Sequence, residues 1–318
     1  MNIIRLSIPW EGIERDRGQY NWTIVRQLKD VVSLCEKNGM YVLLDMHQDA
    51  FSPKFCGNGV PDWVVQPIQR EEILGYPWPL RRTPFTPDTR GYISSKDCES
   101  KPGWAQGQLS LAHGTAWQRF FDNYDGIFDS FVDFWRMIAK EFGWFSNVLG
   151  YDLINEPFAG NTVENPSLLL PGVGDKVNLQ RFNERLTAAI REVDPVSIVT
   201  YESVTWDNVG VGYTRHPDTP ENGSKTAHNW HYYVNQPNIG SPEVTTRQRV
   251  KDALRLGSGS IMSEFSIRWD CGDDCNEEHV QQMEAAETAR VSWIGWVYKG
   301  YDNITGSGPG LWDEWTGE

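Results

Sequence analysis

The sequence predicts an α/β protein built as a (β/α)8, or TIM, barrel. The chain has 318 residues, a length that one large barrel domain commonly uses. Short and almost uninterrupted apolar segments alternate along it with amphipathic helical patterns, as they do in a parallel sheet with helical crossovers. No internal repeat, low-complexity tract or second domain is visible, so residues 1–318 are expected to form a single barrel.

Seven segments have the pattern of buried strands. They are IIRLSIP from Ile3, YVLLDMH from Tyr41, VLGYDLIN from Val148, SIVTYES from Ser197, HNWHYY from His228, SIMSEFS from Ser260 and WIGWVYK from Trp293. Nearly continuous apolar runs are typical of parallel strands covered on both faces. A closed barrel needs eight strands. Because the chain opens directly on a strand, we expect the missing first strand to lie upstream of Met1.

Amphipathic helices are predicted between these strands. The pattern over residues 24–38 stops at Gly39, which suits a helix C-cap. Further helices are expected over about 115–141, 178–193, 245–256 and 276–289. The remaining feature is a long loop insertion over about 50–114, rich in Pro, Gly, Trp and Tyr. Insertions of this length in a compact domain are usually functional.

Composition limits the function classes. The net charge is −14 and no basic patch stands out, so nucleic acid is not an expected partner. There are 15 Trp, 12 Tyr and 13 Phe, a load that suits either core packing or the stacking of sugar rings and binding of lipid. No stretch is apolar for long enough to span a membrane, and no signal peptide is visible.

The five cysteines favour disulfides over a metal site. Cys35 lies in a helical pattern and is expected to be a buried free thiol. The pairs Cys56–Cys98 and Cys271–Cys275 form a plausible disulfide scheme. A zinc site is the alternative, but neither pair has the C-x2-C spacing or a histidine pair nearby. Three sequons, at Asn21, Asn222 and Asn303, are compatible with secretion.

Two glutamates at strand ends are the candidate catalytic residues. Glu156 closes the apolar run of YDLINEP, and Glu264 follows apolar residues in SIMSEFS. A strand-ending turn is the alternative for Glu156, and a structural ion pair is the alternative for Glu264. The two lie on the third and sixth predicted strands, which face one another across a barrel mouth. A pair of facing carboxylates is the arrangement that glycosidases use.

Other hydrogen-bonding groups end neighbouring strands and converge on the same mouth, as a polyhydroxylated ligand requires. Arg5 interrupts an apolar run, so it must be paired with a carboxylate. Asn155 is a candidate to bind a sugar hydroxyl, and Trp296 is either a stacking floor for a sugar or a core residue. The remaining candidates are His47, Asp49, His231 and Tyr233. A metal site using His47, His228, His231 and the acids is the alternative, but no HExxH pattern is present, so neither a metal nor a cofactor is expected.

Together these residues resemble the active site of glycoside hydrolase family 5. NEP is similar to the acid/base motif of that family, with Glu156 as the acid/base, and SEFS to its nucleophile strand, with Glu264 as the nucleophile. The other active-site positions of the family are matched by Arg5, His47, Asn155, His231, Tyr233 and Trp296. The resemblance covers essentially the whole chain. It implies a TIM barrel and a retaining mechanism that needs no cofactor or metal.

More narrowly, the segments LLDMHQDAFSPKFCGNGVPDW, YDLINEPFAG and GWVYKGYDN resemble the animal-type endoglycoceramidases. Members of that group cleave the β-glycosidic bond between the glycan and the ceramide of glycosphingolipids, and Asp49 matches a position that holds the glycan. Members also continue into a C-terminal β-sandwich, which is missing here. In the insertion, the residues expected to line a ceramide channel are Phe51, Phe55, Val60, Trp63, Val64, Ile68, Leu74, Tyr76 and Trp78. Packing of the loop onto the barrel is the alternative.

The resulting prediction is a retaining endo-β-glycosidase that acts on glycosphingolipids at a membrane or micelle surface, in a secreted or lysosomal location. Alternatives within the family are a glucosylceramidase, a steryl-β-glucosidase and a β-glucanase. Outside it, the alternatives are a glycolipid-binding protein without activity and a metal-dependent hydrolase.

Overall fold

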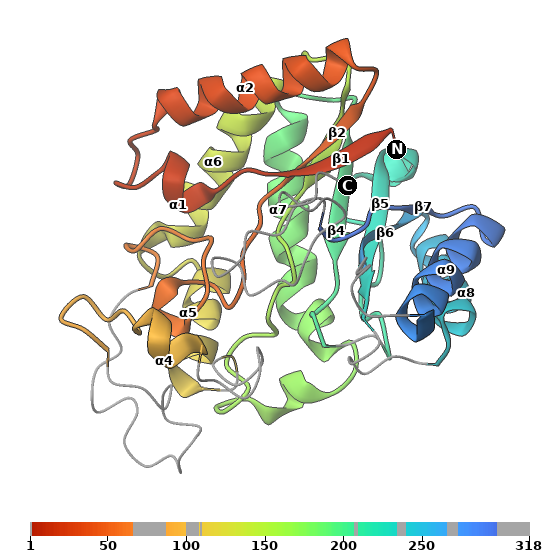
Figure 1. The fold of residues 1–318 in the computed structure, drawn as a ribbon. Coiled ribbons are helices and arrows are strands. Elements are labelled where there is room, and N and C mark those ends of the chain that lie inside the picture. Colours follow the sequence, from red (N-terminus) through yellow and green to blue (C-terminus); the bar gives the residue numbers. More distant parts are fainter. Residues whose placement is uncertain are drawn as a thin grey trace.

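Seven parallel strands form one curled sheet whose order follows the chain (Figure 1). The computed structural model describes residues 2–65, 87–99, 108, 110–206, 209–233, 240–265 and 273–297. The strands are β1 (Ile3–Ser7), β2 (Tyr41–Asp45), β3 (Val148–Asp152), β4 (Ile198–Glu202), β5 (Thr226–Tyr232), β6 (Gly259–Phe265) and β7 (Ser292–Trp293). The first six predicted strands are confirmed, and the seventh only at its start, because β7 includes Trp293 but not residues 294–297, and residues 298–299 lie outside the described residues. The predictions of a further strand and of a β-sandwich concern sequence outside this chain.

Helices follow most strands and cover the outside of the sheet (Figure 1). The long ones are α2 (Trp22–Lys37), α5 (Leu111–Phe121), α6 (Ile127–Phe142), α7 (Gln180–Arg191), α8 (Pro242–Leu256) and α9 (Asp273–Thr288). The short ones are α1 (Trp10–Ile13) and α4 (Ser95–Glu99). Short 3-10 helices are η1 (Pro53–Phe55), η3 (Tyr124–Gly126), η4 (Pro166–Leu169) and η6 (Pro220–Lys225), and η5 (Asp175–Leu179) is a short π-helix. No described helix is long and apolar enough to cross a bilayer.

The single helix predicted over 115–141 is wrong, because the chain forms two helices there, α5 and α6. Asn123, Asp125 and Gly126 all have positive φ, at 56°, 51° and 68°, between these helices. Asn, Asp and Gly are the residues that adopt this left-handed conformation most readily, and it cannot continue an α-helix. The Asn123 side chain also accepts a hydrogen bond from the main chain of Asp129, 3.0 Å away, which replaces a lost helical partner.

Much of the aromatic load packs between the helices and the sheet. Helix α6 buries one broad face, and its Phe131 lies 4.6 Å from the Trp10 ring, centroid to centroid. Other aromatic side chains that are fully buried are Trp117, Trp135, Phe120, Phe134 and Phe142. Buried aromatic rings contribute large apolar areas and favourable tilted contacts. For these residues the core-packing alternative is confirmed.

The described part of the insertion contains a cross-link. A disulfide joins Cys56 to Cys98 and ties η1 to α4, so this predicted pairing is confirmed. Cys35 is free and buried, also as predicted. Cys271 lies outside the described residues, so the pairing Cys271–Cys275 stays a prediction.

The predicted channel-lining residues of the insertion divide into two groups. Phe51, Phe55, Val60 and Val64 are at most 4% exposed and belong to the main core, where Phe51 packs 4.4 Å from the ring of Trp117. These four side chains therefore offer no open apolar surface, and the prediction that they line a channel is wrong for them. Trp63 is half-buried, and it packs edge-on against a core tryptophan. The others, Ile68, Leu74, Tyr76 and Trp78, lie outside the described residues.

Candidate active site

The polar groups predicted for the site gather at the carboxyl ends of the strands. Parallel pairing places Asp45 of β2 beside Asp152 of β3, and Glu202 of β4 beside Asn229 of β5. In βα barrels this end of the sheet carries the functional groups, because the loops that follow the strands converge there. The same pairing places His231 of β5 opposite Glu264 of β6.

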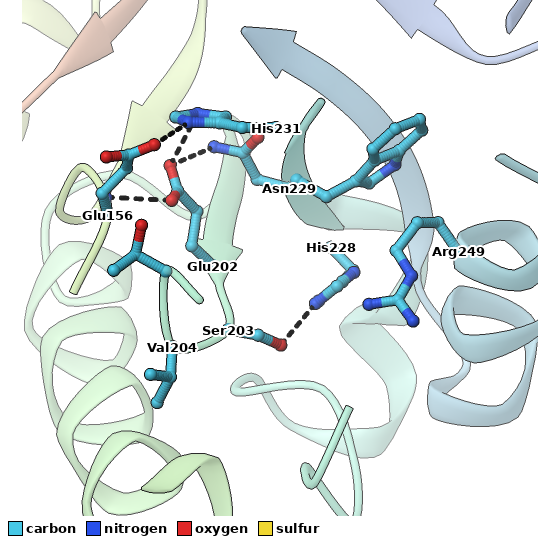
Figure 2. Close-up of a pocket in the computed structure, with 10 residues that line it drawn as sticks. Glu156, Glu202, Ser203, Val204, His228, Asn229, His231 and Arg249 are labelled. Carbon is cyan, nitrogen blue, oxygen red and sulfur yellow. Dashed lines mark hydrogen bonds and ion pairs between the residues drawn. The ribbon is translucent and has the colours of Figure 1, made fainter. Parts of the chain in front are cut away.

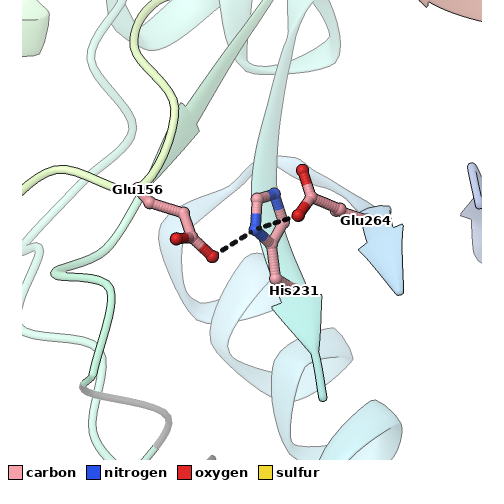
Figure 3. A group of neighbouring side chains, drawn as sticks. All are labelled: Glu156, His231 and Glu264. Carbon is pink, nitrogen blue, oxygen red and sulfur yellow. Dashed lines mark hydrogen bonds and ion pairs between the residues drawn. The ribbon is translucent and has the colours of Figure 1, made fainter. Parts of the chain in front are cut away.

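Both predicted catalytic glutamates lie together, with His231 between them (Figure 3). The imidazole Nδ1 of His231 is 2.9 Å from Glu156 Oε1 and 3.9 Å from Glu264 Oε1. One oxygen of each carboxylate and a nitrogen of His231 all lie within 4.8 Å of one another. Carboxyl groups about 5–5.5 Å apart are typical of retaining glycosidases, whereas inverting enzymes separate them by about 6.5–9.5 Å.

Glu264 is buried and receives a hydrogen bond on each oxygen. Tyr233 donates its hydroxyl hydrogen to Oε1, and Arg5 Nη1 lies 3.0 Å from Oε2. Burial raises the pKa of Glu264, while the positive charges of His231 and Arg5 act in the opposite direction. Burial and the neighbouring carboxylate raise the pKa of Tyr233 well above its ordinary value, so this phenol stays protonated and remains a donor.

Arg5 projects from β1 into the middle of the polar cluster. Its guanidinium contacts four carboxylates, those of Asp45, Asp152, Glu202 and Glu264, at 2.7–3.4 Å. Burial lowers the pKa of Arg5, but the four anions outweigh this effect and raise the pKa well above its usual value. The prediction that Arg5 pairs with an active-site carboxylate is confirmed.

The main chain is strained at Glu156, which has φ of 41°. A residue other than glycine in this region costs on the order of 1–3 kcal/mol and is usually held by its surroundings. Here the amide N–H of Glu156 donates to Glu202 Oε2 at 2.9 Å, and its carbonyl accepts from Gln48 Nε2 at 3.0 Å. Partners on β4 and in the loop after β2 therefore stabilise the turn that presents this glutamate.

Asn155 is engaged by the chain on both ends of its amide. Its Oδ1 accepts from Arg5 Nη2 at 2.8 Å, and its Nδ2 donates to the carbonyl of Gln48 at 2.9 Å. These two bonds set the orientation of the amide. They use Oδ1 and one of the two hydrogens on Nδ2.

His47, Asp49 and Trp296 form a second part of the site. His47 lies between two aspartates, with Nδ1 at 2.8 Å from Asp45 and Nε2 at 3.6 Å from Asp49. Its ring stacks on the indole of Trp296. Burial lowers the pKa of His47, but Asp45 and Asp49 more than offset this and raise it to about 10. Asp45 also contacts Arg5, so it joins this part of the site to the pair of glutamates.

Three buried acids of the site were not predicted. Asp45, Asp152 and Glu202 each end an apolar strand, as in YVLLD, VLGYD and IVTYE. A buried charge at a strand end was the signal that identified Glu264, and it could have found these three as well. Burial raises the pKa of both Asp152 and Glu202, with Arg5 and His231 respectively as the strongest opposing charges.

A small pocket opens beside Glu156 and Glu202 (Figure 2). Its walls are completed by Ser203, Val204, Thr205, His228, Asn229, Trp230, His231 and Arg249. His228, once considered for a metal, is fully buried here, with Nε2 3.1 Å from the Ser203 hydroxyl. Burial and the nearby Arg249 lower its pKa to about 3, so it is neutral.

Glu156, His231 and Glu264 are close enough to ligate a cation. Their atoms already have partners, since His231 bonds Glu156 and both oxygens of Glu264 accept hydrogen bonds. The geometry is therefore that of a hydrogen-bonded acid–base group.

Comparison with known proteins agrees with this geometry. The model of the family described as cellulase (glycosyl hydrolase family 5) matches residues 1–302. The endoglycoceramidase of Hydra vulgaris is 38% identical over 306 residues, which are 96% of this chain and 57% of that protein. The endoglycoceramidase of Cyanea nozakii is 35% identical over 302 residues, 95% of this chain and 58% of that protein. The chain thus spans a little over half the length of these relatives.

A solved structure of endo-glycoceramidase II from Rhodococcus sp., in complex with a five-membered iminocyclitol, has a similar fold. The TM-score is 0.75 at 22% sequence identity, over 94% of this chain and 65% of that one. The shared fold includes the parallel barrel sheet on which the predicted residues meet. Because the family model matches almost the entire chain, the chain belongs to glycosyl hydrolase family 5.

Proposed function

We propose that the protein is a retaining endo-β-glycosidase that cleaves the bond between the glycan and the ceramide of glycosphingolipids. The observation that carries this proposal is the pair Glu156 and Glu264, whose nearest oxygens lie within 4.8 Å. The substrate class rests on the Hydra and Cyanea relatives, which are endoglycoceramidases.

In the first step, Glu264 attacks the anomeric carbon of the sugar attached to ceramide. The carbon–oxygen bond to ceramide breaks, and the proton of Glu156 moves to the departing oxygen. The products are free ceramide, a covalent glycosyl ester of Glu264, and ionised Glu156.

In the second step, a water molecule takes the place that ceramide has left. Glu156 accepts one of its protons, and the resulting hydroxide attacks the anomeric carbon. The ester bond breaks, Glu264 leaves as a carboxylate, and the glycan is released with its original β configuration.

The neighbouring groups support these steps. Arg5 and Tyr233 donate to the two oxygens of Glu264, which orients the carboxylate and favours its anionic form. The half-exposed Asp49 carboxylate is placed to accept hydrogen bonds from glycan hydroxyls. One face of Trp296 is covered by His47, so a sugar ring would use the other face.

We further propose a lipid surface as the partner from which substrate is taken. The loop between β3 and α7 starts at the mouth and exposes Leu169 and Leu170, at 50% and 60%. The loop after β4 lies against it, since Gly172 approaches Gly212, and exposes Val209 at 57%. Neighbouring exposed apolar side chains of this kind mark interaction surfaces. Vesicles of phosphatidylcholine and lactosylceramide should bind Glu264→Gln protein and should bind the Leu169→Glu, Leu170→Glu form of that variant less.

An oxidising compartment, either secreted or lysosomal, is proposed for the protein. The Cys56–Cys98 disulfide supports it, because such bonds persist in oxidising environments and are rare in the cytosol.

The function is tested by product analysis with the full-length protein. A complex ganglioside and glucosylceramide are incubated separately with the protein, and the products are identified by mass. Intact oligosaccharide together with free ceramide supports the proposal. Release of glucose from glucosylceramide alone favours a glucosylceramidase. No release from either contradicts a ceramide glycosidase and directs the assay to steryl glucosides and soluble β-glucans.

A further inference from the structure

Three side chains of the site form a closed ring of contacts. Glu202 Oε2 accepts from the main-chain N–H of Glu156 at 2.9 Å, and Glu202 Oε1 lies 3.2 Å from His231 Nε2. The other imidazole nitrogen of His231 lies 2.9 Å from Glu156 Oε1. Figure 2 shows Glu202 facing both partners from the end of its strand. One carboxylate therefore reaches Glu156 twice, directly at its main chain and through His231 at its side chain.

The direct contact stabilises an unfavourable conformation. Glu156 has positive φ, and its N–H has no place in a strand ladder at this turn. The Glu202 carboxylate supplies a charge-assisted acceptor for that N–H, which is stronger than a neutral one. Without the Glu202 carboxylate, the buried N–H of Glu156 has a weaker acceptor or none, and the strained turn is less stable. The carboxyl group of Glu156 would then no longer be held in one place.

The indirect contact sets the charge of the imidazole. Within the described residues, the titratable groups that face His231 are Glu156, Glu202 and Glu264, with Arg5 and Tyr233 beyond them. Burial alone lowers the pKa of His231, but Glu202 is the strongest of the anions that raise it well above its ordinary value. A doubly protonated His231 donates from Nδ1 to Oε1 of Glu156. The other oxygen, Oε2, is then the one available to carry the proton for the leaving group.

We infer that Glu202 is a positioning residue for Glu156, acting through the strained main chain of that glutamate and through the charge on His231. This inference rests on the proposed function, since it assigns Glu202 to the acid/base step of that reaction. It adds to Glu156 and Glu264 a third glutamate, which acts through Glu156 and His231 and not as acid, base or nucleophile.

The first test measures His231 without substrate. Full-length protein labelled with ¹⁵N-histidine is titrated, and the His231 signals are assigned by their loss in His231→Asn. In Glu202→Gln the pKa of His231 should fall by about one unit or more, because the strongest facing anion is gone. Asp152→Asn is the matched control, since Asp152 is equally buried and also bonds Arg5 and Asn229, yet has no direct contact with His231 among the described residues. An unchanged pKa in Glu202→Gln, or an equal fall in Asp152→Asn, overturns the inference.

The second test uses the leaving group. The ceramide alkoxide of lactosylceramide needs a proton as it leaves. The dinitrophenolate of dinitrophenyl β-lactoside is a stable anion and leaves without one. Glu202→Gln should lower kcat/KM for lactosylceramide by about 10²-fold, the lower range for a general acid, and leave that for the dinitrophenyl compound within about threefold. An equal loss on both substrates indicates general damage and overturns the inference. If wild-type protein hydrolyses neither lactoside, the proposed function fails, while the titration of His231 still decides whether Glu202 governs the imidazole.

Discussion

The imidazole of His47 stacks on the indole of Trp296, with ring centroids 4.8 Å apart and planes only 6° from parallel. Because two aspartates raise the pKa of His47 to about 10, the stacked imidazole is a cation at neutral pH. A cation over an indole face gains electrostatic attraction, more so where water is excluded. One face of the indole is thus covered by the His47 ring.

Stability should therefore depend on the ionisation of His47. Its folded pKa of about 10 lies above the unfolded value near 6.5, so its contribution is complete below about pH 6.5 and is lost as pH rises through about 10. We expect His47→Gln to remove part of the fall in unfolding free energy between pH 7 and 10. Urea unfolding at several pH values measures the free energy of unfolding of both proteins. The His47 contribution is the difference between variant and wild type, because the raised pKa of His231 also makes wild-type stability fall with rising pH.

Glu264→Gln and Glu156→Gln should each lower turnover of the glycolipid by several orders of magnitude while the protein stays folded. The first variant loses the nucleophile and the second loses the transferable proton. With Glu156→Ala and dinitrophenyl β-lactoside, added azide should restore turnover and yield a β-glycosyl azide, because a small anion needs no general base. With Glu264→Ala, any glycosyl azide formed should have the inverted α configuration, because azide then displaces the dinitrophenolate directly from the side of the missing nucleophile. Near-normal activity in either Gln variant contradicts the assignment.

Tyr233→Phe should lower kcat/KM by about 10²-fold, the effect of removing one donor from a reacting oxygen. Tyr151→Phe is a control, since its buried hydroxyl donates to Asp194, away from the strand ends that form the site. That control should lose stability, measured by thermal unfolding, without a comparable loss of turnover. Equal losses of activity in the two variants would mean that Tyr233 acts only in packing.

Arg5→Met should lower the free energy of unfolding by about 3–5 kcal/mol at pH 7, because four buried carboxylates lose their cation. The deficit should shrink toward pH 5, since carboxyl groups without a cation can take up protons. Arg5→Lys keeps the charge and should lose less stability, yet it cannot contact several anions at once as a guanidinium does. Urea unfolding of the three proteins at both pH values checks this. A deficit independent of pH would argue for lost packing instead.

Removing the disulfide should destabilise the barrel. Cys56 and Cys98 are 42 positions apart, and the chain-entropy model assigns about 4 kcal/mol to a loop of this size. Cys56→Ala with Cys98→Ala should therefore lower the midpoint of urea unfolding, and reductant should lower that of wild type to a similar value. Reductant should not affect the double variant further. A double variant as stable as wild type would show that the loop contacts of η1 and α4 suffice.

The strand positions could be predicted because each buried strand is an apolar run, and the two catalytic candidates because a charge at the end of such a run is costly without a role. The break between α5 and α6 was missed, although the DNYDG segment carries the residues that favour left-handed turns. The apolar residues of the insertion were assigned to lipid because hydrophobicity alone cannot distinguish a side chain that faces a ligand from one that faces the core. Phe51 packs against Trp117, a contact between residues 66 positions apart that only the folded chain reveals.

The role of Glu202 shows a second limit. The inferred role rests on contacts with the main chain of Glu156, which follows β3, and with the side chain of His231 on β5, and no local pattern links the three. The turn at Glu156 also has positive φ without glycine, so the sequence gives no local sign of it. The sequence therefore identified Glu156 and Glu264 as the candidate reacting groups, and it gave no sign that Glu202 contacts the main chain of Glu156.

The ion pair between Arg5 and Glu264 also bears on synthesis, because the two residues are 259 positions apart. At translation rates of about 5–20 residues per second, Glu264 emerges on the order of tens of seconds after Arg5. During that interval the guanidinium of Arg5 can pair only with acids of earlier strands, which emerge in the order Asp45, Asp152 and Glu202. The guanidinium therefore has an anionic partner from the second strand onward, and its contact with Glu264 is the last of the four ion pairs that synthesis allows.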